Sequence, residues 1–155
     1  MPILVPGYHF GVVVADLGKA MDELTELLGL EWLEPVRCGR QVSPFGAPAI
    51  GPMMTFSKQG PPYFELLEQV PNSIWSETGL HHVGFFADDT RTESLRMAEA
   101  GFPLQATATV HESATEPGVC YHRTTDGLLV EIVEQWVGAP ALTYYLTGAG
   151  TPQDA

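Results

Sequence analysis

Two glutamates occupy matching places in two near-identical apolar stretches of this 155-residue sequence. Glu65 lies in the stretch Phe-Glu-Leu-Leu-Glu-Gln, and Glu131 lies in the stretch Val-Glu-Ile-Val-Glu-Gln. A carboxylate among apolar neighbours is costly to bury unless a cation or a hydrogen-bond donor lies close to it. Two histidines, His9 and His82, begin two other apolar stretches that also resemble each other. The repeated acids and histidines therefore form one set of candidate functional residues.

This set has the chemistry of a metal site. Two imidazoles and two carboxylates make a suitable ligand set for a divalent ion, and the two carboxylates would balance its charge. A mixed nitrogen and oxygen set without a thiolate suits nickel, cobalt, manganese, zinc or iron, with positions left open for water or substrate. The sequence therefore predicts one divalent metal ion, of unspecified identity, bound by His9, Glu65, His82 and Glu131.

A second explanation of the glutamates needs no metal. A glutamate on an exposed edge strand is unremarkable in itself, and a duplication copies such a residue as readily as a functional one. Glu68 and Glu134 were copied in the same way, and we interpret both as facing solvent. Two histidines and two glutamates at equivalent points of two copies nevertheless favour the metal site.

The elements that hold these residues follow from an internal repeat. The stretch His-Phe-Gly-Val-Val-Val-Ala-Asp at 9–16 matches His-Val-Gly-Phe-Phe-Ala-Asp-Asp at 82–89, and both are predicted strands. A helix is predicted after each strand, and each half ends in a hairpin whose connecting segments have equal length. Asp126-Gly127 marks the turn of the second hairpin.

The helix limits are predicted from capping residues. Asp16 is the expected N-cap of the first helix and Gly29 its C-terminal stop. Thr90 and Glu93 have the spacing of a capping box at the start of the second helix, and Gly101 is its stop. The first helix shows an apolar face of Leu17, Met21, Leu24 and Leu28.

Strand alternation predicts which side chains share a face. If His9 faces the inner side of the sheet, Gly11 does so too. By the same rule His82 faces inward and its neighbour His81 faces outward. Glu65 and Glu131 face inward on the last strand of each half.

The predicted fold is therefore α+β, with two paired βαβββ modules that form a curved mixed sheet around a concave face, and with the helices outside. We expect one domain over 1–155. It divides into a first module at 8–70, a linker at 71–79, a second module at 80–136 and a C-terminal tail at 137–155.

Charge and composition exclude several functions. The net charge of -12 argues against nucleic acid and against anionic membrane surfaces, because both need clustered Lys and Arg. No apolar run approaches the length of a membrane span, and no signal-peptide pattern opens the chain, so a cytoplasmic location is expected. The two cysteines are expected to be reduced thiols.

Four segments of this chain resemble the signature segments of the vicinal oxygen chelate superfamily. They are His-Phe-Gly-Val-Val-Val-Ala-Asp-Leu, Phe-Glu-Leu-Leu-Glu, Gly-Leu-His-His-Val-Gly-Phe and Asp-Gly-Leu-Leu-Val-Glu-Ile-Val-Glu, in the family order. The resemblance covers roughly 8–136. The superfamily includes glyoxalase I, methylmalonyl-CoA epimerase, extradiol dioxygenases, and the fosfomycin and bleomycin resistance proteins. Its fold is a cup of paired βαβββ modules around a metal, and homodimers are common in it, so the resemblance implies a homodimer.

The resemblance also places the family's metal ligands on His9, Glu65, His82 and Glu131. Glutamate at position 65 resembles glyoxalase I, whereas the epimerases usually carry glutamine there. Extradiol dioxygenases use a triad that would fall on His9, His82 and Glu131, but Glu65 would crowd their open position. Bleomycin-binding members generally lack the complete set. A metal-dependent lyase, isomerase or epimerase is therefore favoured, with an iron dioxygenase and a non-catalytic binding or resistance protein as alternatives.

The chemistry implied by the enolate branch is proton transfer next to a metal-bound carbonyl of a small-molecule substrate. The resemblance makes Glu65 and Glu131 candidate bases, with Glu131 slightly favoured. His122 is a further candidate acid or base, because a two- or four-residue hairpin loop would turn it to the side of Glu131, whereas a bulged turn would turn it outward. No clamp for glutathione or coenzyme A is apparent, which favours a smaller or neutral substrate. Expected substrate-binding residues are Phe56, Tyr63 and Tyr121.

Overall fold

The structure is a computed structural model that describes residues 5–39, 41, 50–109 and 117–134. The expected tail at 137–155 and the last two residues of the second module lie outside these described residues. Within them, both halves of the chain show the same order of elements. The first half contains β1 (Val5–Val14), α1 (Leu17–Leu28), β2 (Val36–Arg37), β3 (Met53–Phe56) and β4 (Tyr63–Glu68). The second half contains β5 (Gly79–Ala87), α2 (Thr90–Glu99), β6 (Leu104–Ala108), β7 (Val119–Arg123) and β8 (Leu129–Glu134).

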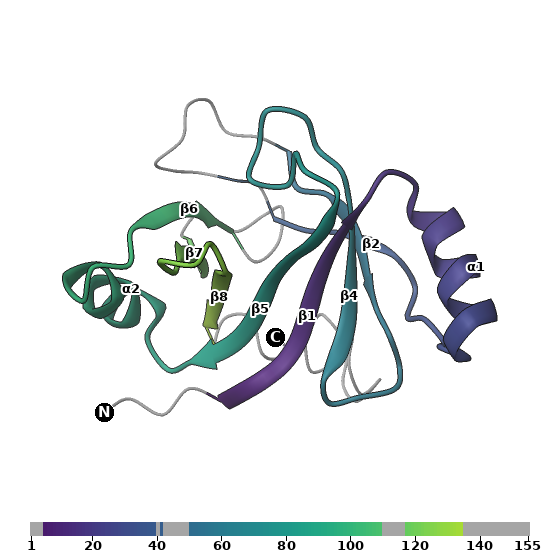
Figure 1. Ribbon diagram of the computed structural model, residues 1–155, viewed down its shortest axis with the longest axis horizontal. Coiled ribbons are helices and arrows are strands. Elements are labelled where there is room, and N and C mark those ends of the chain that lie inside the picture. Colours follow the sequence, from purple (N-terminus) through teal and green to yellow (C-terminus); the bar gives the residue numbers. More distant parts are fainter. Residues whose placement is uncertain (1–4, 40, 42–49, 110–116, 135–155) are drawn as a thin grey trace.

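All strands join in one curved sheet with the order β2-β3-β4-β1-β5-β8-β7-β6. The two halves meet where β1 pairs antiparallel with β5. On their other sides, β1 pairs in parallel with β4, and β5 pairs in parallel with β8. The remaining pairs are antiparallel. Figure 1 shows the two helices at opposite ends of the sheet, α1 beyond β4 and α2 beside β6 to β8. The predicted α+β fold of two paired βαβββ modules, with a curved mixed sheet and the helices outside, is confirmed.

The helix ends follow the predicted caps with one difference. The Asp16 side chain accepts a hydrogen bond from the Lys19 N–H, and Gly29 ends α1 in the left-handed region at φ 69°. The second helix is capped by Asp89 and not by Thr90, because the Asp89 carboxylate accepts from the Thr92 N–H at 3.0 Å. The predicted capping box is therefore wrong by one residue.

The two hairpins differ in length, so the prediction of equal connecting segments is wrong. Phe56 pairs with Glu65 across the first hairpin, so residues 57–64 connect them. Tyr121 pairs with Glu131 across the second hairpin, so residues 122–130 connect them. The extra residue of the second hairpin shifts its register by one. A shift of one residue moves every side chain of a strand to the other face of the sheet.

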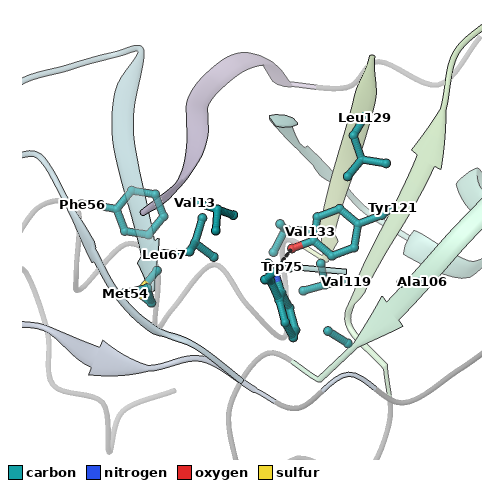
Figure 2. Close-up of a cluster of buried hydrophobic side chains, with 11 residues drawn as sticks. Val13, Met54, Phe56, Leu67, Trp75, Ala106, Val119, Tyr121, Leu129 and Val133 are labelled. Atoms are coloured by element: carbon teal, nitrogen blue, oxygen red, sulfur yellow. Dashed lines mark hydrogen bonds between the residues drawn. The ribbon is translucent and has the colours of Figure 1, made fainter. Parts of the chain in front are cut away.

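The described residues contain one cluster of buried apolar side chains. It includes side chains from both halves, and the largest fully buried ones are Trp75, Tyr121 and Phe56. Figure 2 shows Phe56, Met54 and Leu67 of the first half facing Tyr121, Val119 and Val133 of the second. Both cysteines are free thiols, as predicted. Among the described helices, neither combines the length and the apolar character that a membrane span requires.

Candidate metal centre

The four predicted ligands lie on the four central strands and meet in one cluster. His9 is on β1, Glu65 on β4, His82 on β5 and Glu131 on β8, and each is at most 5% exposed. One donor atom from each residue lies within 4.8 Å of the others. All four come from one chain, so the cluster is complete without a partner subunit.

Strand pairing explains why these residues converge. Glu65 is paired with Gly11, and Gly11 is paired with His82, so one row across the sheet is glutamate, glycine, histidine. The other row has the same composition, because Glu131 is paired with Gly84 and Gly84 with His9. The antiparallel pairing of β1 and β5 thus places the histidine of each half directly beside the glycine of the other half.

The glycine in each row is required by the close approach of a histidine ring. A Cβ atom built on Gly11 would collide with the ring of His82, and one built on Gly84 would collide with the ring of His9. Each imidazole therefore lies over the backbone of the neighbouring strand. The repeated His-x-Gly spacing is explained by this exchange: each half provides the space for the other half's ligand.

The electrostatics of the cluster are those of opposite charges held in an apolar core. Burial alone would lower the pKa of His9, but the charge of Glu65 and hydrogen bonds with both carboxylates raise it to about 9. Burial alone would raise the pKa of Glu65, but the charge of His9 and the close contacts with His82 and His9 hold this pKa well below its usual range. The pKa of Glu131 is also lowered, against the effect of burial, by His82 and His9. Both carboxylates are therefore ionised at neutral pH.

The spacing of the donor atoms fits one divalent ion. His9 Nε2 lies 2.9 Å from His82 Nε2 and 3.2 Å from Glu65 Oε2 and from Glu131 Oε1. His82 Nε2 lies 3.0 Å from Glu65 Oε2 and 3.5 Å from Glu131 Oε2. Donors bound to one ion with bonds of about 2.1 Å lie about 3.0 Å apart at right angles and about 3.4 Å apart in a tetrahedron.

The buried carboxylate supports the same conclusion. Glu65 Oε2 is buried, and it lies between the two ligand histidines, 3.2 Å from His9 Nε2 and 3.0 Å from His82 Nε2. A buried carboxylate is costly unless a cation lies beside it, and the protonated His9 ring holds the place that a metal ion would take between these donors. The residues present therefore fit a divalent metal, and two imidazoles with two carboxylates would hold it.

A small apolar cavity lies next to this cluster. Its volume is about 60 Å³, and both glutamates open onto it. Tyr121, a predicted substrate-binding residue, lines the cavity and pairs with Glu131 across the sheet. Its hydroxyl donates to Glu131 and accepts from Trp75 Nε1 at 3.4 Å, and burial and Glu131 raise the pKa of this hydroxyl well above its usual range. Figure 2 shows the contact of Trp75 with Tyr121.

The other two predicted substrate-binding residues lie elsewhere. Phe56 packs its ring edge-on against His9, with 5.4 Å between the ring centroids, and pairs with Glu65 across the first hairpin. Tyr63 is half-buried at the start of β4. Neither is among the described residues that line the cavity.

His122 lies on the opposite face of the sheet, so the prediction that it faces the metal cluster is wrong. It pairs with Val130, and a five-residue connection at 124–128 sets this register in place of the two or four residues that were expected. His122 Nε2 lies 2.7 Å from Ser94 Oγ, and its Nδ1 lies 2.8 Å from the Phe102 carbonyl. These contacts attach α2 to β7. Tyr121, and not His122, is therefore the β7 residue that lies beside the metal cluster.

His81 contacts the cluster, so the prediction from strand alternation that it faces outward is wrong. Its Nδ1 lies 2.8 Å from Nδ1 of His82, and its Nε2 lies 2.7 Å from the carbonyl oxygen of Ile74. Burial and then the charge of His82 lower the pKa of His81 to about 4. The double histidine was visible in the sequence, but the local bulge that turns His81 inward was not.

Substituting either glycine of the two rows should disturb both stability and metal binding. Gly84→Ala and Gly11→Ala are expected to cost about 1–3 kcal/mol each, because the added methyl group must displace a ligand ring. Zinc affinity, measured by chelator competition, should fall by about 10- to 100-fold. Gly18→Ala is the control, because Gly18 lies in α1 and a Cβ atom added there would lie 3.7 Å from Asp16 Oδ1, an ordinary contact distance. Equal zinc affinities for all three variants would contradict this explanation.

The stability of the metal-free protein should fall as pH rises from about 6.5 to 8. The pKa of His9 is raised from 6.5 in the unfolded chain to about 9 in the folded protein. The protonated ring therefore contributes its full stabilisation of the folded state below pH 6.5, and this stabilisation is lost as the pH approaches 9. The range from about pH 6.5 to 8 lies below the titration of unfolded thiols at about 8.5. Urea midpoints with chelator present measure the effect. His9→Gln should show a flatter profile, and identical slopes for both proteins would refute the assignment.

Comparisons with known proteins agree with the fold. A family model described as the Glyoxalase/Bleomycin resistance protein/Dioxygenase superfamily matches residues 8–121. No curated protein matches the sequence.

Solved structures of similar fold include methylmalonyl-CoA epimerases. The enzyme from Mycobacterium tuberculosis is 17% identical with a TM-score of 0.56, and the match covers 85% of this chain and 92% of that one. A variant of the Streptomyces coelicolor enzyme, in complex with 2-nitronate-propionyl-CoA, is 17% identical with a TM-score of 0.60 over 85% and 95% of the chains. A hypothetical protein from Bacillus halodurans C-125 is 19% identical with a TM-score of 0.56 over 81% and 91%. This chain therefore belongs to the Glyoxalase/Bleomycin resistance protein/Dioxygenase superfamily.

Proposed function

We propose that this protein is a metal-dependent enzyme that moves a proton next to the carbonyl of a small-molecule substrate, as a lyase, isomerase or epimerase. The observation that carries the proposal is the complete, buried set of His9, Glu65, His82 and Glu131 beside an apolar cavity. When bound there, a divalent metal would polarise the substrate carbonyl and stabilise the oxyanion that forms after proton loss.

The glutamates are the proposed bases. Both have lowered pKa values and therefore carry no proton at neutral pH, and both open onto the cavity. Glu131 is held by the hydroxyl of Tyr121, which keeps its own proton because its pKa is raised. Glu65 Oε2 instead lies beside the two ligand histidines, 3.2 Å from His9 Nε2 and 3.0 Å from His82 Nε2. Tyr121 would thus orient one carboxylate and offer a proton donor at the cavity wall.

The cavity favours an uncharged substrate. Its described walls are mostly apolar, as at Met54 and Trp75, and their uncharged polar groups are the Cys38 thiol and the hydroxyls of Thr109 and Tyr121. The described ionised groups are the two glutamates. Burial raises the pKa of the Cys38 thiol well above its usual range, so this group is also neutral. Several similar structures contain coenzyme A ligands, but no described cation lines this cavity to hold a comparable carrier. We therefore propose a short carbonyl substrate with a neighbouring oxygen.

The position of Glu65 favours proton transfer over oxygen chemistry. Its Oε2 lies 3.2 Å from His9 Nε2 and 3.0 Å from His82 Nε2, which is the spacing of a fourth ligand. A dioxygenase built on His9, His82 and Glu131 would need that position for oxygen or substrate. A homodimer remains a prediction from the family resemblance, and light scattering of the purified protein would test it.

Zinc-, cobalt- or nickel-loaded protein should catalyse exchange of the α-proton of acetoin, an uncharged carbonyl compound with a neighbouring hydroxyl group. Proton NMR in D₂O measures the exchange, which chelation should abolish. Glu65→Gln and Glu131→Gln each keep an oxygen ligand, and the variant that lacks the base should lose at least about 100-fold in rate while it retains metal.

Glu68→Gln is the matched control, because Glu68 is the half-buried second glutamate of β4. Exchange that survives in chelated protein would refute the metal-dependent mechanism. Acetoin binding without exchange by any metal form would favour a binding protein instead. Oxygen uptake with Fe(II) and catechol, in the absence of proton exchange, would favour a dioxygenase.

A further inference from the structure

We propose that His81 is a positioning residue that fixes the tautomer and orientation of His82 by connecting its ring to the carbonyl of Ile74. The proposal rests on the metal site of the proposed function, and it assigns a role to the segment that joins the two modules. The contacts that carry it lie outside the four ligands, on the far side of the His82 ring.

A β-bulge places His81 at the cluster. Gly11 pairs with His82 whereas Val12 pairs with Leu80, so His81 is an additional residue of β5 opposite this step of β1. An additional residue in one strand locally redirects the side chains around it. The His81 ring therefore packs against the rings of His82 and Tyr121, with centroid distances of 5.1 and 5.8 Å, in place of the outward orientation that strict alternation would give.

The hydrogen bonds have one consistent direction. A carbonyl oxygen accepts hydrogen bonds and cannot donate them, so Nε2 of His81 must donate to Ile74 at 2.7 Å. A neutral imidazole has one N–H donor and one acceptor nitrogen, so with the proton of His81 on Nε2 its Nδ1 is the acceptor. The donor at 2.8 Å is then Nδ1 of His82. A proton on Nδ1 leaves Nε2 of His82 as the nitrogen that is available to a metal.

This assignment of donors and acceptors agrees with the geometry of the cluster. His82 Nε2 is the atom that lies 2.9 Å from His9 Nε2 and 3.0 Å from Glu65 Oε2. The histidine that ligates a metal is commonly held by a hydrogen bond from its other nitrogen to a fixed acceptor. Here the acceptor is a second histidine, which is itself held by the backbone.

The Ile74 carbonyl is fixed by its own surroundings. The Ile74 N–H donates to Gln41 Oε1 at 2.7 Å, and the next N–H, of Trp75, donates to Ser73 Oγ at 3.0 Å. The turn is closed by a hydrogen bond from the Val70 N–H to the Trp75 carbonyl at 3.0 Å. Trp75 also contacts the Tyr121 hydroxyl that holds Glu131. Two successive linker residues thus support both ligands of the second module.

Ring ¹⁵N spectra of the metal-free, full-length protein test the tautomers directly. The proposal expects a proton on Nε2 but not on Nδ1 of His81, and a slowly exchanging proton on Nδ1 of His82. A proton on Nδ1 of His81 would overturn it. This readout needs neither metal nor substrate, so it decides the role of His81 even if the wild-type protein binds no zinc and the proposed function fails.

Two substitutions test the consequence for the metal. His81→Phe retains an aromatic ring beside Tyr121 but removes the acceptor, and zinc affinity should fall about 10- to 100-fold. His81→Asn retains an oxygen near the position of Nδ1, and its loss should be clearly smaller. Val83→Ala, on the same strand, is the control with wild-type affinity. Wild-type affinity for His81→Phe, or equal losses for both His81 variants, would overturn the proposal.

Discussion

The contact of a glycine in one half with a histidine of the other half is the constraint on which the rest of this structure depends. Antiparallel pairing of β1 and β5 places Gly11 beside His82 and Gly84 beside His9. Each imidazole lies over a backbone that carries no side chain, and this close approach brings two nitrogens to 2.9 Å. The glutamates of β4 and β8 then complete the same two rows. The fold and the site are therefore specified by the same few contacts.

The apolar surroundings give this cluster its chemical character. Charges separated by about 3 Å interact more strongly in a dry interior than in water, and they cost more if one partner is removed. Without a metal, His9 and both carboxylates stabilise one another, as their shifted pKa values indicate. The same arrangement suits a divalent ion, which can replace the proton of His9 with little movement of the ligands.

The sequence was sufficient to predict the fold and to single out the four residues that converge, because a repeat shows equivalent positions and strand alternation assigns faces to them. The sequence was not sufficient where one additional residue in a loop or strand determines which face of the sheet a side chain lies on. His122 was misplaced because the second hairpin is one residue longer than the first, and its register depends on loop geometry. His81 was misplaced because a bulge interrupts alternation. Trp75 lies in a linker without periodicity, so only the folded turn shows its contact with Tyr121.

The unequal hairpins also make the two sides of the cup chemically different for a molecule bound between them. With identical halves, a two-fold axis would run through the cluster, and an asymmetric molecule could enter in two orientations of equal energy. The register of the second hairpin instead places the Tyr121 hydroxyl where the first half presents the hydrocarbon ring of Phe56. At this pair of positions Tyr121 can donate a hydrogen bond and Phe56 cannot. This difference of one oxygen atom removes the degeneracy and gives the centre a handedness, so the two faces of a planar molecule bound there would meet different surroundings.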